Sequence, residues 1–117
     1  MYLCGMNRKV QYYKDYFIDF YNSLDKSAQY KIAYVIQYIK TEVRWNEKFV
    51  KFIRDGIFEL RANHNGNIYR VFFILDDGNI VVLFNGFQKK SQKTPKQEIK
   101  QALKLKEQYY ADKQQHS

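Results

Sequence analysis

The sequence predicts a single α+β domain in which an N-terminal helical hairpin and a C-terminal helix pack on an antiparallel sheet. Three observations predict it. Apolar residues recur every three or four positions between residues 13 and 43, which is the period of an α-helix. From Ile57 onward the chain changes to β-rich runs separated by tight-turn dipeptides. A capped helical pattern then returns after residue 94.

The first elements are a short strand at Arg8–Tyr13 and two helices. The first helix presents one apolar face, made of Tyr13, Phe17, Phe20, Tyr21 and Leu24. Asp25 or Ser27 can cap a second helix, because a short polar side chain there accepts from the free backbone amides. The apolar stripe of that helix is Ile32, Val35, Ile36, Ile39 and Val43. A tight polar turn joins the two, so we expect an antiparallel hairpin.

The strands come next, as a three-stranded meander. The expected ranges are Ile57–Asn63, Asn67–Leu75 and Asn79–Phe87. Asn65-Gly66 and Asp77-Gly78 separate them, and such dipeptides supply the positive φ angles of a hairpin turn. The last two strands are apolar on both faces, so both faces must be covered.

The last helix has a clear start signal. Thr94 is the expected N-cap, Pro95 the first helical residue and Gln97 the partner in a capping box. Its sparse apolar stripe is Ile99, Ala102, Leu103 and Leu105. We expect one domain over residues 1–117, with a weakly ordered leader at 1–7 and a weakly ordered tail at 111–117.

Composition excludes several classes of protein. Cys4 is the lone cysteine and the two histidines are far apart, so neither a disulfide nor a zinc site is expected. We expect no metal and no cofactor, and the cytoplasm as the simplest setting. No apolar run approaches the length of a transmembrane helix, so no membrane partner is expected.

Positive charge is concentrated after the last strand. Residues 89–106 contain seven lysines, one acid and no arginine, and carry +6 of the chain's net +8. Such a cluster attracts a phosphate-rich partner, because neutralising phosphates releases condensed counterions. The alternative is a solvated lysine face that serves solubility.

Charged residues also interrupt the apolar strands. Glu59 and Arg61 share one strand face, and Arg70 lies in an otherwise apolar strand. A buried arginine is costly unless it meets a carboxylate or a phosphate. Arg70 and Glu59 can therefore form a purely structural pair. Alternatively, Arg61, Arg70, Lys89 and Lys90 converge on one surface, where they would stabilise the transition state of RNA cleavage by its own 2′-hydroxyl.

Four segments carry a resemblance to a known family, and they span the region between Val10 and Tyr110. They are Phe58-Glu59-Leu60-Arg61, Ile68-Tyr69-Arg70-Val71, Phe87-Gln88-Lys89-Lys90 and Lys93-Thr94-Pro95. In this spacing the chain resembles the HigB-like branch of the RelE/ParE toxin superfamily, a branch related to phage-derived toxin-like proteins. The resemblance implies a RelE-like fold, with a helical hairpin on a twisted, mostly antiparallel sheet and a C-terminal helix. It also implies a type II toxin that cuts mRNA on the ribosome without a metal, and a small helix-turn-helix antitoxin as its partner.

Roles carry over residue by residue. Arg70 matches the arginine that stabilises the scissile phosphate, and Lys90 matches a catalytic basic position, with Lys89 beside it. Arg61 matches an arginine that holds RNA. Two positions depart from the RelE pattern: Glu59 replaces a lysine, and this chain reads Thr94-Pro95-Lys96 where the RelE type has a tyrosine near the start of the final helix. The general base therefore stays open between Glu59, a neutral lysine and His64.

We accordingly predict a ribosome-dependent mRNA endoribonuclease toxin. The expected catalytic residues are Arg70, Lys90 and Glu59, and the expected RNA-binding residues are Arg61, Lys89, Lys93 and Lys96. One alternative is a ParE-like topoisomerase inhibitor without nuclease activity, although basic residues at positions 70 and 90 argue against it. Another is a non-enzymatic nucleic-acid binding module, or a decayed toxin, in which Glu59 fully engages Arg70.

Overall fold

The computed structural model describes residues 7–90 and 95–115. In chain order its elements are β1 (Lys9–Tyr12), α1 (Tyr16–Asn22), α2 (Lys26–Thr41), β2 (Val50–Arg54), β3 (Ile57–His64), β4 (Asn67–Asp76), β5 (Ile80–Lys89) and α3 (Lys96–Gln115). Residues 1–6 of the expected leader, and the expected N-cap Thr94, lie outside the described residues.

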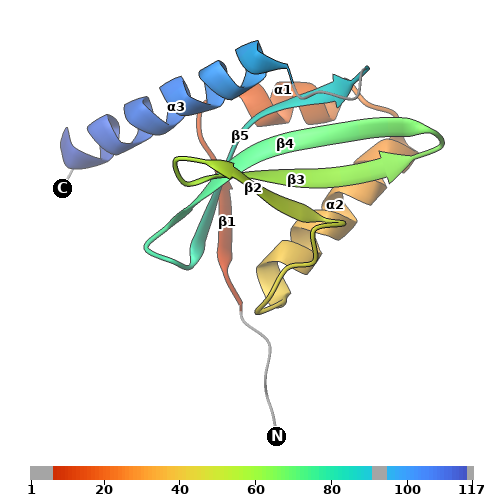
Figure 1. Cartoon of the computed structure of the whole chain (residues 1–117), viewed down its shortest axis with the longest axis horizontal. Helices are drawn as coiled ribbons and strands as arrows, with labels where there is room; N and C mark the ends of the chain where they lie inside the picture. The colour runs from red at the N-terminus through yellow and green to blue at the C-terminus, as the bar shows by residue number, and fades with distance from the viewer. Residues whose placement is uncertain (1–6, 91–94, 116–117) are drawn as a thin grey trace, which may run out of the picture.

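The strands form one five-stranded sheet in the order β1-β5-β4-β3-β2. β1 pairs with β5 in parallel, and the other three pairings are antiparallel hairpins (Figure 1). This confirms the α+β class and the mostly antiparallel sheet. The meander is confirmed with nearly the expected ranges, and β1 falls where the first strand was expected.

β2 is the strand that the sequence did not predict. It joins β3 through Asp55-Gly56, with φ angles of 50° and 79°. The two predicted turns have almost the same geometry, with φ of 51° at Asn65 and 54° at Asp77 before their glycines. All three are turns in which two consecutive residues adopt positive φ, and these match the twist of the strands they join.

One face of the sheet is covered by α1 and α2. α1 packs over β5 and α2 over β3, and the side chain of Gln29 on α2 donates to the carbonyl of Tyr21 on α1 at 2.8 Å. The predicted N-terminal helical hairpin is therefore not confirmed, since the chain starts with a strand and each helix packs on its own strand. Asp25 caps α2, as expected, by accepting from the amide of Ala28 at 2.8 Å. The core on this face includes Phe17, Ile32, Val35, Ile39, Leu60, Val71 and Phe73.

Two residues of the predicted helical stripes lie elsewhere. The amide of Tyr13 donates to the carbonyl of Leu83 at 3.1 Å, so Tyr13 still follows the path of β1. Its ring packs against Phe84 and Tyr109 on the opposite face of the sheet. Val43 lies beyond the end of α2 and is 53% exposed.

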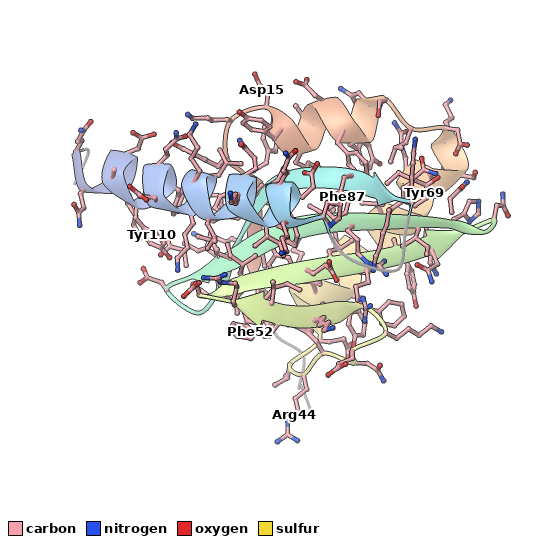
Figure 2. The ribbon with its side chains drawn as sticks, turned by 45° about the horizontal axis from the view of Figure 1, so that its top comes forward. Asp15, Arg44, Phe52, Tyr69, Phe87 and Tyr110 are labelled. Carbon is pink, nitrogen blue, oxygen red and sulfur yellow. The ribbon has the colours of Figure 1, made fainter. Side chains whose placement is uncertain are left out.

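The other face is covered in part by α3. Ala102 and Leu105 are its buried residues, and they pack on Phe72, Phe84 and other side chains of β4 and β5. α3 begins at Lys96, one residue later than expected, and the carbonyl of Pro95 accepts from the amide of Ile99. In Figure 2, α3 runs along the β5 side of the sheet, and the ribbons of β3 and β2 lie clear of it.

The C-terminal part of α3 is anchored where the sequence predicted a weakly ordered tail. The helix includes residues up to Gln115. The buried carboxylate of Asp76 accepts from the hydroxyl of Tyr109 at 2.6 Å and from Nζ of Lys113 at 2.7 Å. Within the described residues, none of the helices is long and apolar enough to span a membrane.

Candidate RNA-cleavage site

A cluster of charged side chains lies on the α3 face of the sheet, beyond the part that α3 covers. The register accounts for it: Lys51 on β2 pairs with Glu59 on β3, and Arg61 pairs with Arg70 on β4. Directly paired residues of antiparallel strands point to the same face. Lys89, at the end of β5, pairs with Ile68 of β4 and joins the same face. We call Lys51, Glu59, Arg61, Arg70 and Lys89 the basic cluster.

A bulge in β5 decides which lysine joins the basic cluster. The register shifts between the pairs Val71–Gly86 and Phe73–Leu83, so β5 carries one extra residue there. Strict alternation from Phe84 would turn Lys90 toward the cluster, but the extra residue turns Lys89 there instead. The bulge also turns Asn85 toward α3, where its amide donates to the carboxylate of Glu98 at 2.9 Å.

Glu59 is the only acidic residue of the basic cluster, and two arginines share it. Its Oε1 lies 3.5 Å from Nε of Arg61 and 3.5 Å from Nε of Arg70. Glu59 is 1% exposed. A buried carboxylate between two guanidinium groups fixes their positions, and it offsets the repulsion between arginines that face each other across the strands.

Arg70 is held tightly at the base of the cluster. It is 5% exposed, and its Nη1 donates to the carbonyl of Tyr69 at 3.0 Å and to Oδ1 of Asn63 at 3.5 Å. Burial lowers the pKa of Arg70, and the nearby charge of Arg61 lowers it further, while Glu59 acts in the opposite direction. The guanidinium remains charged, because an arginine pKa is far above neutral.

Lys89 and Arg61 are partly exposed members of the basic cluster, and Lys51 is exposed. Burial lowers the pKa of Lys89, and the positive charges of Arg70, Arg61 and Lys51 add to this effect against Glu59. Because its pKa is lowered, Lys89 loses its proton more easily than a free lysine does. The side chain of Arg61 is 26% exposed, and its Nη1 donates to the carbonyl of Glu47 at 3.1 Å.

The structure therefore brings together four of the residues predicted for the site: Glu59, Arg61, Arg70 and Lys89. Lys90 is exposed just beyond the end of β5, and Lys93 lies outside the described residues. Lys96 lies on the first turn of α3, where it lines a separate groove with Arg54, Ile99, Lys100 and Leu103.

His64 lies on the opposite face from the basic cluster. On β3 the cluster takes residues 59 and 61, so alternation turns residue 64 to the α2 side. Consistently, the charge of His64 contributes to lowering the pKa of Asp25, at the start of α2. His64 therefore lies on the wrong face of the sheet to act as a base at the basic cluster.

Two residues of this region were not expected from the sequence: Lys51, a member of the basic cluster, and Asn63, a neighbour of Arg70. Lys51 was missed because β2 was missed, and the signal was present: Asp55-Gly56 is a hairpin dipeptide of the same kind as the two that were used. Asn63 had no signal in the sequence, since its role depends on the rotamer that reaches Arg70.

The chemistry available to the basic cluster is charge stabilisation and proton transfer. Four cations surround one carboxylate, which leaves an excess of positive charge on a face that α3 does not cover. Such an arrangement suits an anion whose charge grows during reaction. Within residues 7–90 and 95–115, no group of three His, Cys, Asp or Glu side chains is placed to hold a metal ion.

Comparison with known proteins agrees with this fold. The crystal structure of the archaeal RelE–RelB complex from Pyrococcus horikoshii OT3 contains a chain that superposes with a TM-score of 0.52 at 17% sequence identity. The match covers 76% of this chain and 100% of that one, so the fold is that of RelE. No curated protein matches the chain.

Residues 19–107 match the family described as Phage derived protein Gp49-like (DUF891). The matched segment contains most of the sheet, all five members of the basic cluster and the first half of α3. It covers well over half of the sequence. The chain therefore belongs to the Gp49-like family of phage-derived proteins.

Proposed function

We propose that this protein is the toxin of a type II toxin–antitoxin system, of the HigB-like kind, and that it cleaves mRNA on the ribosome in the cytoplasm. The observation that carries the proposal is the basic cluster, which places four cations and one shared carboxylate on the part of the sheet that α3 does not cover, in a chain with the RelE fold. The sequence spacing of the Arg61, Arg70 and Lys89-Lys90 motifs supports the same assignment.

Cleavage would proceed by attack of the substrate's own 2′-hydroxyl. The 2′-oxygen forms a bond to phosphorus and loses its proton, while the bond to the 5′-oxygen of the next nucleotide breaks and that oxygen gains a proton. The products carry a 2′,3′-cyclic phosphate and a 5′-hydroxyl. The protein then has to orient the phosphate, stabilise its added negative charge and move two protons.

Arg61 and Lys89 are the groups that we assign to direct phosphate contact, because both are at the accessible side of the cluster. Arg70 lies beneath them and adds a fixed charge in a poorly hydrated position, where a charge acts more strongly than in water. Glu59 acts as a positioning residue, since it holds both arginines by one oxygen. Lys90, which is exposed just beyond the end of β5, is assigned a supporting contact with RNA.

Lys89 is the group that we assign to proton transfer. It is partly accessible, it lies on the cluster face, and its pKa is lowered by burial and by neighbouring cations. A base works best when its pKa is near the working pH, and a lowered lysine pKa moves in that direction. Glu59 is a poorer choice, because at 1% exposure a 2′-hydroxyl cannot reach its oxygens.

An antitoxin is the natural partner of such a toxin. The RelE chain that shares this fold was solved in complex with RelB, and we extend that association to this chain. We propose a small helix-turn-helix protein, encoded beside the toxin, as the cognate antitoxin.

A second candidate is a nucleic-acid binding module that performs no cleavage. The observation in its favour is the engagement of Arg70 by Glu59, Tyr69 and Asn63, which leaves this guanidinium little surface for a phosphate. In that case the basic cluster would bind RNA but would not accelerate its cleavage.

Controlled expression in a bacterial host tests the proposal. Induction of the wild type should arrest growth, with loss of translation and no change in DNA supercoiling, and the neighbouring gene should restore growth. Arrest with altered supercoiling would favour the topoisomerase inhibitor. Normal growth after verified expression would favour the binding module.

A further inference from the structure

A second cationic pocket adjoins the basic cluster at the edge of the sheet. It has a volume of about 260 Å³ and is lined by Lys31 of α2, Lys48 and Phe49 of the segment before β2, and Arg61 and Asn63 of β3. We call it the edge pocket. Three of these five side chains are cationic, and the lining contains no carboxylate among the residues that the structure describes.

The edge pocket and the basic cluster are connected through two shared side chains. Arg61 lines the pocket and also lies 3.5 Å from the carboxylate of Glu59 in the cluster. Asn63 lines the pocket, and its Oδ1 accepts from Nη1 of Arg70 at 3.5 Å. A strand of RNA with one phosphate at the cluster would therefore bring an adjacent part of its backbone to the pocket.

Aromatic rings surround the cations of this pocket. The Phe49 ring packs against Tyr38 and Tyr34, with ring centres 4.6 and 6.2 Å apart. Tyr34 is 58% exposed, and the ammonium of Lys31 lies 5.2 Å from the centre of its ring. Cations interleaved with an exposed aromatic face are the combination that single-stranded nucleic-acid sites use, since the cations take phosphates and the ring takes a base.

The size of the edge pocket limits what it can hold. Pockets for whole small-molecule ligands usually begin at about 300 Å³. At about 260 Å³ and open to solvent, this pocket suits a single phosphate group with part of its nucleoside. Because its described lining has three cations and no carboxylate, the pocket favours an anionic ligand.

We propose that the edge pocket binds a flanking phosphate of single-stranded RNA, one that neighbours the scissile phosphate, and that Tyr34 stacks on the attached base. This inference rests on the proposed function for the position of the scissile phosphate. Binding by Lys31 and Lys48 does not require that cleavage occurs.

The first experiment measures binding of free RNA, so that it is independent of cleavage and of the ribosome. The probe is a short single-stranded RNA in which every 2′-hydroxyl is methylated, and its Kd is measured across a salt series. The test variant is Lys31→Gln with Lys48→Gln. The control is Lys9→Gln with Lys40→Gln, which removes the same charge from β1 and from the far end of α2.

The pocket variant should bind about tenfold more weakly, as for loss of a charge-assisted phosphate contact. Its plot of log K against log salt should be less steep by about 0.7, the value for one phosphate of a single strand. The control variant should bind RNA as the wild type does. Tyr34→Ala should weaken RNA binding both in the wild type and in the control variant. Equal losses in the pocket and control variants, or no loss in either, would overturn the inference.

A second experiment separates this inference from the proposed function. In single-turnover cleavage of mRNA on programmed ribosomes, the pocket variant should need a higher concentration for half-saturation and should keep the maximal rate. Absence of cleavage by the wild type would refute the proposed function while the free-RNA result still decides the pocket. Displacement of RNA from the pocket by an acidic peptide at lower concentration than by RNA itself would replace RNA with a protein partner, and would overturn the inference.

Discussion

The shared carboxylate of Glu59 gives the most sensitive test of how the basic cluster is held together. Glu59→Gln keeps the size and shape of the side chain and removes its negative charge. Two guanidinium groups that lie opposite each other across β3 and β4 would then lose their counter-charge. Lys51 and Lys89 add to the uncompensated positive charge on this face.

The expected loss of stability follows from burial. The side chains of Glu59 and Arg70 are 2% and 6% exposed, and breaking such a buried pair costs about 3–5 kcal/mol. Arg61 is 26% exposed, so water screens part of its share, and we expect the lower end, about 3 kcal/mol. For a chain of this length, about 1 kcal/mol corresponds to about 4 °C, so Tm should fall by about 12 °C.

Thermal and urea unfolding measure this, with Glu47→Gln as the matched control. Glu47 is exposed and contacts Arg61 through its backbone carbonyl, so removing its side-chain charge should change Tm by about 2 °C or less. Adding Arg70→Met to Glu59→Gln should recover part of the loss, because no buried arginine remains unpaired. Sulfate should stabilise Glu59→Gln more than the wild type, since an anion can replace the missing charge.

A fall in Tm of about 2 °C or less, no larger than that of the Glu47→Gln control, would refute this reasoning. So would strictly additive effects of the Glu59 and Arg70 substitutions, because the two side chains are assigned to one charged unit.

Three further predictions concern proton transfer, docking and acid stability. The cleavage rate of the wild type should rise with pH and level off below the usual lysine pKa of about 10.4. Lys89→Met should remove this pH dependence, whereas Lys90→Met should keep it and only raise the half-saturating concentration. Equal pH profiles for both variants would exclude Lys89 as the base. Lys96, Lys100 and Lys104 form an exposed ridge on α3. Neutralising these three lysines should flatten the salt dependence of ribosome co-sedimentation. Curves that superimpose on those of the wild type would mean that the ridge is only a solvated face. Burial raises the pKa of Asp76, but hydrogen bonds from Lys113 and Tyr109 outweigh this effect and lower the pKa overall. The ionised Asp76 therefore stabilises the fold fully above its unfolded pKa of about 3.9, and this stabilisation is lost as pH falls through the lower folded pKa. Asp76→Asn should therefore reduce stability at neutral pH and flatten the stability curve in that acid range, and an unchanged acid limb would contradict it.

Much of the sheet could be predicted because short sequence motifs encode its turns. Asn65-Gly66 and Asp77-Gly78 fix both hairpins of the meander through positive φ, and the strands between them have strong β composition. β2 was missed although Asp55-Gly56 carries the same signal, because the five residues before it include exposed Lys51 and Phe52 and lack a continuous apolar run. The turn dipeptide was the better guide there.

The helices show where local periodicity stops being informative. Tyr13 fits the helical stripe of α1 by spacing, but pairing with β5 keeps it in an extended path and packs its ring under α3. α3 extends to Gln115 because Asp76 binds Lys113 and Tyr109, a contact between residues more than thirty positions apart. Neither long-range interaction has a local signature.

The sequence predicted which residues belong to the candidate site more fully than it predicted how their side chains are arranged. The alternation of β3 placed Glu59 and Arg61 on one face, and the structure confirms that placement. The choice between Lys89 and Lys90 depends on the bulge in β5, which inserts one residue between Phe84 and Phe87 and reverses the later alternation. The close approach of Phe20 to Gly86 lies at the same place: a Cβ on Gly86 would be 2.4 Å from the Phe20 ring, and that packing cannot be read from one sequence.

The most direct test of the central claim is the chemistry of the RNA ends made on ribosomes. Purified wild-type protein is added to ribosomes that carry a defined mRNA, and the ends of the fragments are mapped and identified. We predict cuts within the translated frame that leave a 2′,3′-cyclic phosphate and a 5′-hydroxyl. We also predict a rate at least about a hundredfold lower for folded Arg70→Ala, because the fixed charge beneath the phosphate would no longer stabilise the transition state. Intact mRNA with the wild type, or equal cleavage by Arg70→Ala, would contradict the assignment of the basic cluster as an RNA-cleavage site.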